Sequence, residues 1–248
     1  MLAIIGGSGL SQLSNLPISR RQVVRTPYGE PSGALIFGAI GDHEVVFLAR
    51  HGYGHTIPPH EINYRANLWA LESVGATDVL AVATVGGIPS ELGPGALVVP
   101  DQVIDYTHGR KSTYFDTSEK PVTHIDFTEP YCQTMRARCM KAVEAAGDCC
   151  IDGGVYAAVQ GPRLESRAEI DRLARDGAAM VGMTCMPEAA LARELNLCYA
   201  TLAVVVNYAA GRGGNQHAIA FDEIAAVMER AMGRVRHILE HLVEVNDG

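Results

Sequence analysis

The sequence has little of what marks a nucleic-acid, membrane or secreted protein. Its 20 lysines and arginines are outnumbered by 28 aspartates and glutamates, and the formal net charge is -8. A general nucleic-acid binder needs clustered basic side chains, so that class is excluded, although a small local anion pocket is not. No apolar run approaches the length of a membrane span. The N-terminal apolar run lacks a basic flank and is too short for a signal peptide. We therefore expect a soluble cytoplasmic protein without nucleic-acid or membrane partners.

The cysteines and histidines also lack the spacing of a cross-linked or metal-binding framework. None of the six cysteines is paired in a C-x-x-C motif, and no secretory context is present, which favours reduced and mostly buried thiols. His51, His55 and His60 cluster in a stretch rich in glycine and proline that offers no helical register, so we expect no metal. The cysteines concerned are Cys132, Cys139, Cys149, Cys150, Cys185 and Cys198.

Apolar segments of strand length alternate along the 248 residues with segments of helical periodicity. This alternation predicts one α/β domain over residues 1–248, with a central mixed, twisted β-sheet flanked by helices. The long polar segment 102–129 is expected to be a functional loop. Strands are predicted at 2–5, 34–40, 44–49, 78–85, 96–100, 153–159, 178–182 and 197–206, and helices at 63–73, 130–146, 166–175, 188–195 and 221–243.

The stretch Leu2–Leu10 begins with an apolar strand and continues as Gly-Gly-Ser-Gly-Leu. Glycines let the backbone turn sharply and approach a ligand closely. Backbone N–H groups in such a turn, together with the Ser8 hydroxyl, form a concave surface that suits an oxyanion, which we interpret as inorganic phosphate. Gln12 breaks the Gly-x-Gly-x-x-Gly dinucleotide fingerprint, and the Lys-Ser/Thr of a Walker loop is absent. A purely structural turn is the alternative.

Two further predicted strands end in groups that can bind an oxyanion. Arg50 and His51 follow the strand 44–49, and the guanidinium offers a rigid fork of donors while the imidazole adds one more. Thr84 and Val85 end the strand 78–85 with a hydroxyl and backbone N–H groups beside two glycines. A surface charge beside a turn histidine is the alternative at Arg50 and His51.

Six ordered motifs carry a resemblance to a known family. They are Gly6-Gly7-Ser8-Gly9-Leu10, Leu48-Ala49-Arg50-His51-Gly52, Asn63-Tyr64-Arg65-Ala66-Asn67, Gln160-Gly161-Pro162-Arg163, Gly182-Met183-Thr184 and Pro187-Glu188. Together they resemble the trimeric purine nucleoside phosphorylases, and within them the branch that acts on 5′-methylthio nucleosides. The resemblance covers essentially the whole chain. It implies the nucleoside phosphorylase fold, a homotrimer, and phosphorolysis with inorganic phosphate as co-substrate and without metal or organic cofactor.

The resemblance also implies roles for individual residues. Phosphate would be held by Ser8, Arg50, His51, Thr84, the Val85 backbone N–H and Thr184. Met183 would lie against the ribose, and Leu164 takes the place of a residue, often phenylalanine, that packs on the purine face. Because Leu164 is not aromatic, stacking should be weaker here. Arg50, His51 and Asn207 are the expected catalytic residues.

Glu165 and Asn207 indicate which purine is bound, since in the resemblance both line the base. A carboxylate at Glu165 accepts from the N1–H of a 6-oxopurine but faces a lone pair on adenine. Asn207 can donate to O6 and accept from a protonated N7. Tyr208 and Ala209 follow at the same edge and are also expected to bind the substrate. Adenosine-type members instead carry Asp at positions 207 and 209 and a small hydroxyl residue at 165, so hypoxanthine is favoured. A helix N-cap at Glu165 and a turn residue at Asn207 are the alternatives.

The 5′ end of the nucleoside is expected to meet Phe221 and Ile224, which align approximately with apolar residues of a methylthio pocket. Burying a thiomethyl group against these side chains is favourable, whereas burying an unpaired hydroxyl is not. His217 lies nearby, and His124 resembles a residue that reaches the 5′ pocket of a neighbouring subunit. Ordinary core packing is the alternative for Phe221.

The sequence therefore predicts phosphorolysis of S-methyl-5′-thioinosine to hypoxanthine and 5-methylthioribose 1-phosphate. Phosphorolysis of inosine or guanosine is a close alternative, and that of methylthioadenosine is less favoured. A nucleotide-dependent oxidoreductase conflicts with the broken glycine fingerprint. A non-catalytic purine-binding protein would bind nucleosides without phosphate-dependent turnover.

Overall fold

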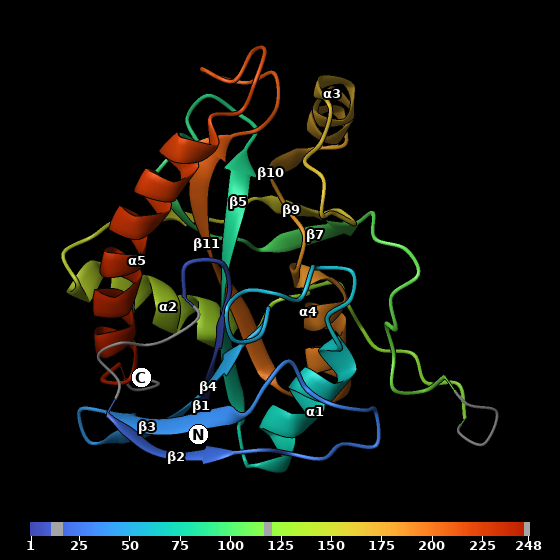
Figure 1. Ribbon diagram of the computed structural model, residues 1–248, viewed down its shortest axis with the longest axis vertical. Coiled ribbons are helices and arrows are strands. Elements are labelled where there is room, and N and C mark those ends of the chain that lie inside the picture. The colour runs from blue at the N-terminus through green and yellow to red at the C-terminus, as the bar shows by residue number, and fades with distance from the viewer. Residues whose placement is uncertain (11–16, 117–120, 246–248) are drawn as a thin grey trace.

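The computed structural model describes residues 1–10, 17–116 and 121–245 (Figure 1). Residues 117–120 of the predicted polar loop lie outside this part of the chain. Within the described residues the strands are β1 (Leu2–Gly6), β2 (Ile18–Gln22), β3 (Leu35–Ile40), β4 (His43–Ala49), β5 (Asp78–Gly87), β6 (Leu97–Val99), β7 (Gln102–Asp105), β8 (Ile151–Asp152), β9 (Val155–Ala158), β10 (Ala178–Gly182) and β11 (Cys198–Tyr208). The helices are α1 (Tyr64–Ser73), α2 (Gln133–Ala145), α3 (Arg167–Arg175), α4 (Cys185–Glu194) and α5 (Phe221–Leu242).

The strands described form one mixed sheet, in the order β2-β3-β4-β1-β5-β10-β9-β7, with β11 paired to the other side of β5 and leading to β6 and β8. β1 runs parallel to both β4 and β5, and β11 runs parallel to β5. β10 is antiparallel to β5, and Val181 of β10 pairs with Gly86 of β5. The carboxyl ends of β1, β4, β5, β10 and β11 therefore converge on one region.

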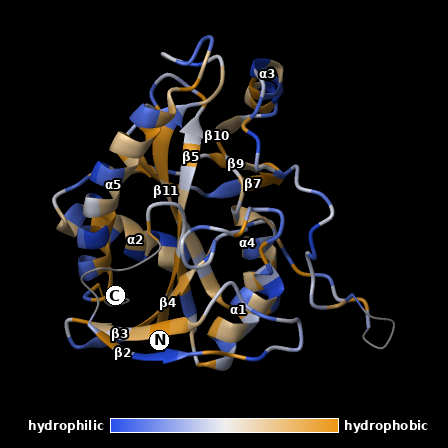
Figure 2. Cartoon of the chain, in the orientation of Figure 1, coloured by the Kyte–Doolittle hydropathy of each residue, from blue (hydrophilic) through white to orange (hydrophobic). Residues whose placement is uncertain are grey.

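Helices cover both faces of the sheet, and this explains why its central strands are almost continuously apolar. In β1, Ala3 and Ile5 face one core and Leu2 and Ile4 the other, as the two-residue period of a strand requires. Figure 2 shows the central strands as mainly hydrophobic and the outer faces of the helices as mainly hydrophilic.

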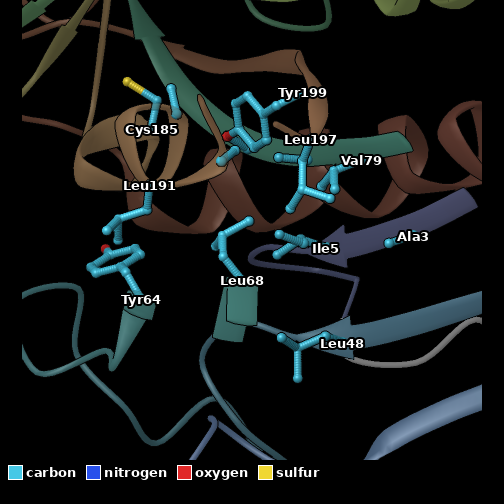
Figure 3. Close-up of a cluster of buried hydrophobic side chains, with 14 of the residues drawn as sticks. Ala3, Ile5, Leu48, Tyr64, Leu68, Val79, Cys185, Leu191, Leu197 and Tyr199 are labelled. Carbon is cyan, nitrogen blue, oxygen red and sulfur yellow. The ribbon is translucent and has the colours of Figure 1, made fainter. Parts of the chain in front are cut away.

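The first core lies between the sheet and helices α1 and α4. Leu68 of α1 and Leu191 of α4 are fully buried there with Ile5 of β1 (Figure 3). The second core packs α2 and α5 on the other face, with Met135 and Val235 fully buried. Covering both faces fixes the strands, and hence the positions of the residues that follow them.

The predicted fold class is confirmed, and the differences are local. β2 is an exposed edge strand, β7 lies within the predicted loop, and β8 has only two residues, so none carries a clear apolar period. α4 is assigned from Cys185, but Met186 is non-helical (φ -117, ψ 136), so regular helix begins close to the predicted position. No helix of the described residues combines the length and apolar composition needed to cross a membrane.

The prediction of reduced thiols is wrong for one pair of cysteines. Cys132 and Cys198 form a disulfide, with Cα atoms 5.1 Å apart. Cys132 is the N-cap of α2, and Cys198 is the first residue of β11. The Cys132 backbone N–H donates to the carbonyl of Tyr199 at 2.8 Å, which brings the two segments together. Since 66 residues separate the two cysteines, their spacing in the sequence did not reveal the pairing.

Candidate active site

A cavity of about 590 Å³ lies where the strand ends converge. Most of the residues that the sequence singled out line this cavity, although they come from segments far apart in the chain. Those residues are Ser8, Arg50, His51, Thr84, Val85, Leu164, Glu165, Met183, Thr184, Asn207, Ala209, Phe221 and Ile224. Tyr208 and His124 are not among them.

The glycine turn after β1 forms one wall of the cavity through Gly7 and Ser8. A Cβ at Gly7 would lie 2.5 Å from the carbonyl oxygen of Val82 and 3.0 Å from Nη1 of Arg50, so only glycine fits. Gly9 has φ +77, a conformation that glycine adopts without strain. The sequence forms this turn because close approach and positive φ both demand residues without a side chain.

Arg50 follows β4 into the floor of the cavity, where its side chain is 1% exposed. Nε and Nη2 donate to the two carboxylate oxygens of Glu188 at 2.7 and 2.9 Å, and Nη1 donates to the Val82 carbonyl at 3.1 Å. Burial alone would lower the pKa of Arg50, but the Glu188 carboxylate more than offsets this and raises it. The guanidinium is therefore charged and rigidly held, with two of its five N–H groups left for a ligand.

Glu188 is a positioning residue that the sequence analysis quoted only as part of a motif. It is fully buried in α4 and accepts from the Tyr199 hydroxyl at 2.8 Å as well as from Arg50. Burial raises the pKa of Tyr199 well above its ordinary value, so the phenol stays a donor. The Thr201 hydroxyl donates in turn to the Tyr199 oxygen. The one available signal was a carboxylate among the apolar residues of the first two turns of α4.

His51 lies beside Arg50, 8% exposed, with its ring on the cavity wall. Its Nδ1 is 2.8 Å from the carbonyl oxygen of Ile57. Burial, with the neighbouring Arg50 charge, lowers the pKa of His51 to about 4. The imidazole is therefore neutral at neutral pH.

Three further groups face the same part of the cavity. Thr84 and Val85 lie near the carboxyl end of β5, and Thr184 is the N-cap of α4, where its side chain makes no capping hydrogen bond. The pairing of β5 with β11 shifts register between Val205 and Asn207. A bulge of this kind re-aims side chains next to a site.

Glu165 and Leu164 approach the cavity from the segment between β9 and α3. Ser166 caps α3, accepting from the Glu169 N–H at 3.2 Å, while the Glu169 carboxylate accepts from the Ser166 N–H at 2.7 Å. This capping box fixes the backbone immediately after Glu165. Glu165 itself is not the cap, which removes the structural alternative for it. Burial raises the pKa of the Glu165 carboxyl, so a donor from a ligand would stabilise its ionised form.

Asn207 lies at the end of β11, half-buried, and lines the cavity with Ala209. Its Nδ2 donates to the carbonyl of Tyr208 at 2.6 Å, so one N–H and the side-chain oxygen remain for a ligand. Tyr208 was predicted at the same edge but lies outside the cavity. Successive side chains of a strand point to opposite faces, so Tyr208 points away from the cavity that Asn207 lines. Its hydroxyl donates to the Ser90 carbonyl at 3.0 Å.

Part of the cavity lining is apolar. Phe221 and Ile224, at the start of α5, are joined there by Ile219 and Met228. Phe221 is 69% exposed, so it is not a core residue. His217 is exposed and does not line the cavity. His124 lies in the exposed loop before α2, and its predicted contact with a neighbouring subunit stays a prediction.

Arg110 is a second supporting residue that the sequence analysis missed. It lies in the predicted functional loop, and its Nη1 donates to the carbonyls of Met183 and Met186 at 2.8 and 2.6 Å. Its Nη2 donates to the carbonyl of Gln160 at 2.9 Å. One guanidinium therefore ties the end of β10 to the segment that leads to Glu165.

The phosphorylase superfamily model matches residues 1–244 of this sequence. The chain belongs to that family. It is 50% identical over 244 residues to a probable S-methyl-5′-thioinosine phosphorylase of Pseudomonas syringae, with 98% of each chain covered. It is 45% identical to the 6-oxopurine nucleoside phosphorylase of Pyrococcus furiosus, covering 92% of this chain and 86% of the relative.

Among solved structures, the fold is similar to that of methylthioadenosine phosphorylase from Schistosoma mansoni in complex with adenine. The TM-score is 0.93 and the identity 33%, with 98% of this chain and 90% of the other covered. The family resemblance read from the ordered motifs is therefore confirmed.

Proposed function

We propose that this phosphorylase-family enzyme converts S-methyl-5′-thioinosine and inorganic phosphate to hypoxanthine and 5-methylthioribose 1-phosphate. The observation that carries the proposal is the arrangement of one cavity. It is lined by the turn that we assign to the oxyanion, by the acid–amide pair Glu165 and Asn207, and by apolar side chains from the start of α5. The relatives named above act on nucleosides that match parts of this reaction.

The choice of hypoxanthine rests on Glu165 and Asn207, which line the same cavity. Glu165 supplies the acceptor that the N1–H of a 6-oxopurine needs. Asn207 has one free N–H for O6 and a free oxygen for a proton on N7. Adenine would leave the Glu165 carboxylate facing the N1 lone pair. A site with unpaired buried polar groups can reject an analogue by roughly 10⁴-fold.

The methylthio group is favoured over a 5′-hydroxyl by the apolar wall of Ile219, Phe221, Ile224 and Met228. None of these four side chains can pair with a hydroxyl, and His217 does not reach the cavity. A hydroxyl buried there would lose its hydrogen bonds to water.

The chemistry follows from the same geometry. Cleavage of the N-glycosidic bond passes through a sugar with oxocarbenium character. A phosphate dianion held between the Ser8 turn and Arg50 stabilises this cation and then bonds to C1′, and fixing it there removes much of the entropic barrier. The electron pair of the broken bond leaves with the purine. Donation from Asn207 to O6 stabilises the negative charge that develops on the ring.

We further infer that the enzyme works in the cytoplasm as a homotrimer without metal or organic cofactor. The ordered motifs support these inferences through the resemblance that they carry. Gel filtration with light scattering gives the oligomeric state directly.

The test is a base-release assay with methylthioinosine, inosine and methylthioadenosine, each with and without phosphate. Phosphate-dependent release of hypoxanthine, fastest from methylthioinosine, is expected. Release without phosphate would indicate a hydrolase, and faster release from methylthioadenosine would overturn the assignment of the base. Faster release from inosine would overturn only the assignment of the 5′ substituent.

The apolar wall makes a separate prediction. Ile224→Ser should lower kcat/KM for methylthioinosine about tenfold, because one methylene-scale contact is worth about 1–3 kcal/mol, and should change the value for inosine much less. Val23→Ser is the matched control, since Val23 is 81% exposed and does not line the cavity. Equal losses for both nucleosides in Ile224→Ser would contradict a 5′ contact.

A further inference from the structure

Arg110 lies where two segments of the cavity wall meet. β7 and β10 both run parallel to β9, so the chain leaves all three strands at the same edge of the sheet (Figure 1). The pairing continues past β7, since the Tyr106 N–H donates to the Ala158 carbonyl at 2.8 Å. The His108 N–H then donates to Oε1 of Gln160 at 3.1 Å. These bonds bring Arg110 within reach of the segments that follow β9 and β10.

The guanidinium of Arg110 holds both segments through backbone carbonyls. Nη2 donates to the carbonyls of Val159 and Gln160, just after β9, at 3.3 and 2.9 Å. Nη1 donates to the carbonyls of Met183 and Met186, after β10, at 2.8 and 2.6 Å. These four acceptors are main-chain oxygens, so the bonds fix the backbone itself. Because the guanidinium is a rigid planar fork, it also fixes the spacing between the two segments.

The two segments are in direct contact as well. Gly161 has φ +61, and a Cβ at this position would clash with Sδ of Met183. The main chain at Gly161 therefore packs closely against the Met183 side chain, which only glycine allows. The capping box of α3 fixes the chain after residue 165, so the segment 161–165 is held at both ends. The position of Glu165 relative to Met183 thus depends on Arg110.

The groups assigned to phosphate are held by other contacts. Ser8, Arg50, His51 and Thr84 come from β1, β4 and β5 and the turns that follow them. Apart from the hydroxyl of Tyr64 in α1, the acceptors of Arg110 lie after β9 and β10. Of the residues assigned to phosphate, Thr184 alone is adjacent to one of these acceptors. The cavity therefore has two parts, and a different guanidinium supports each.

We propose that Arg110 is a positioning residue that sets how strongly the enzyme distinguishes 6-oxopurines from 6-aminopurines, by fixing the spacing between Met183 and Glu165. The inference rests on the proposed function in placing the base against Glu165. Recognition requires the carboxylate at hydrogen-bond distance from N1 while the nucleoside lies against Met183. With a looser spacing, hypoxanthine would gain less from its match to the carboxylate, and adenine would lose less from its mismatch.

The test compares the unaltered enzyme with Arg110→Lys by calorimetric titration with hypoxanthine and with adenine. Lysine keeps the charge but has one ammonium group in place of the fork, so it cannot bind both segments in the same geometry. The ratio of the two affinities should move toward one by about tenfold, within the roughly 100-fold that a misplacement of about 1 Å can cost. An unchanged ratio would overturn the proposal, and so would a ratio already near one in the unaltered enzyme.

Phosphate affinity separates positioning of the base from a general loosening of the site. Titration of Arg110→Lys with inorganic phosphate should give an affinity within about threefold of the unaltered value, because groups without shared partners act almost independently. If phosphate and both bases were weakened in the same proportion, the role would be structural only and the proposal would be overturned.

Arg136→Lys is the matched control. Arg136 also donates to two backbone carbonyls, those of Pro100 and Val99 at 3.0 and 3.3 Å, but these residues do not line the cavity. The control should lose resistance to urea and keep the ratio of base affinities. A shift of that ratio as large as in Arg110→Lys would overturn the proposal.

A measurement on the unaltered protein guards against misfolding of the variants. In nitrogen-15 NMR, the Nη hydrogens of Arg110 should exchange with solvent more slowly when hypoxanthine is bound, because coupling between two sites is reciprocal. Phosphate alone should leave their exchange unchanged. Equal exchange with and without hypoxanthine would overturn the proposal.

The titrations and the NMR measurement need no turnover, so they are independent of the base-release assay. Absence of phosphate-dependent release would refute the proposed function and leave the result for Arg110 readable. A preference of the unaltered enzyme for adenine would refute the choice of hypoxanthine. A move of the ratio toward one in Arg110→Lys would still support the role of Arg110.

Discussion

Replacing Glu188 by alanine should lower the free energy of unfolding by about 3–5 kcal/mol, as removal of one partner of a buried ion pair generally does. Arg50 would keep its charge without a counter-charge although its side chain is only 1% exposed. Tyr199 would lose its hydrogen-bond acceptor as well. Urea denaturation measures the change in stability. The KM for phosphate should also rise, because the guanidinium would no longer be held in place.

Glu44→Ala is the matched control for this variant. Glu44 also accepts from an arginine, Arg20, at 3.2 Å, but the two side chains are 54% and 53% exposed. Exposed ion pairs contribute about 0–1 kcal/mol, so the control should unfold close to the unaltered protein and keep its KM for phosphate. Equal free energies of unfolding for the two variants would show that the buried pair of Arg50 and Glu188 contributes no more to stability than the exposed pair.

Asn207→Asp should lower kcat/KM for methylthioinosine by about 10²–10³-fold, the usual loss when one donor to a developing negative charge is removed. An ionised aspartate has no N–H for O6 and repels that oxygen. A 6-amino base, by contrast, can donate to the new carboxylate. The preference between methylthioinosine and methylthioadenosine should therefore move toward the adenine compound. Parallel base-release assays with the two nucleosides measure this ratio.

Asn215→Asp is the control for the change of amide to acid. Asn215 also donates to the Tyr208 carbonyl, at 2.5 Å, but it does not line the cavity. Its substitution should leave the ratio between the two nucleosides unchanged. If Asn207→Asp left that ratio unchanged too, Asn207 would have no part in recognising the base.

The strands that carry the site could be predicted from sequence because both their faces are covered. β1, β5 and β11 read as continuous apolar runs, and their ends are marked by glycine or by an abrupt polar residue. β2 and β7 were missed for the opposite reason. β2 is exposed along its whole length and β7 is short and polar, so neither has a pattern that burial would impose.

The residues at the strand ends could be predicted, but not the contacts that hold them. Arg50 and Glu188 are 138 positions apart, and no local pattern connects an arginine after one strand with a carboxylate inside a later helix. The same holds for Arg110, most of whose acceptors are backbone carbonyls, which no residue type in the sequence reveals. Tyr208 was placed in the cavity because the sequence locates the strand end without fixing which face each residue takes.

The cavity wall is assembled from Gly7 at one extreme of the chain to Met228 near the other. Most residues assigned to phosphate lie before position 86 and those assigned to the nucleoside lie after position 163, so the two groups come into contact only when the entire sheet has formed. A partly folded molecule should consequently have no activity. Turnover would then report the population of complete molecules, with no contribution from intermediates.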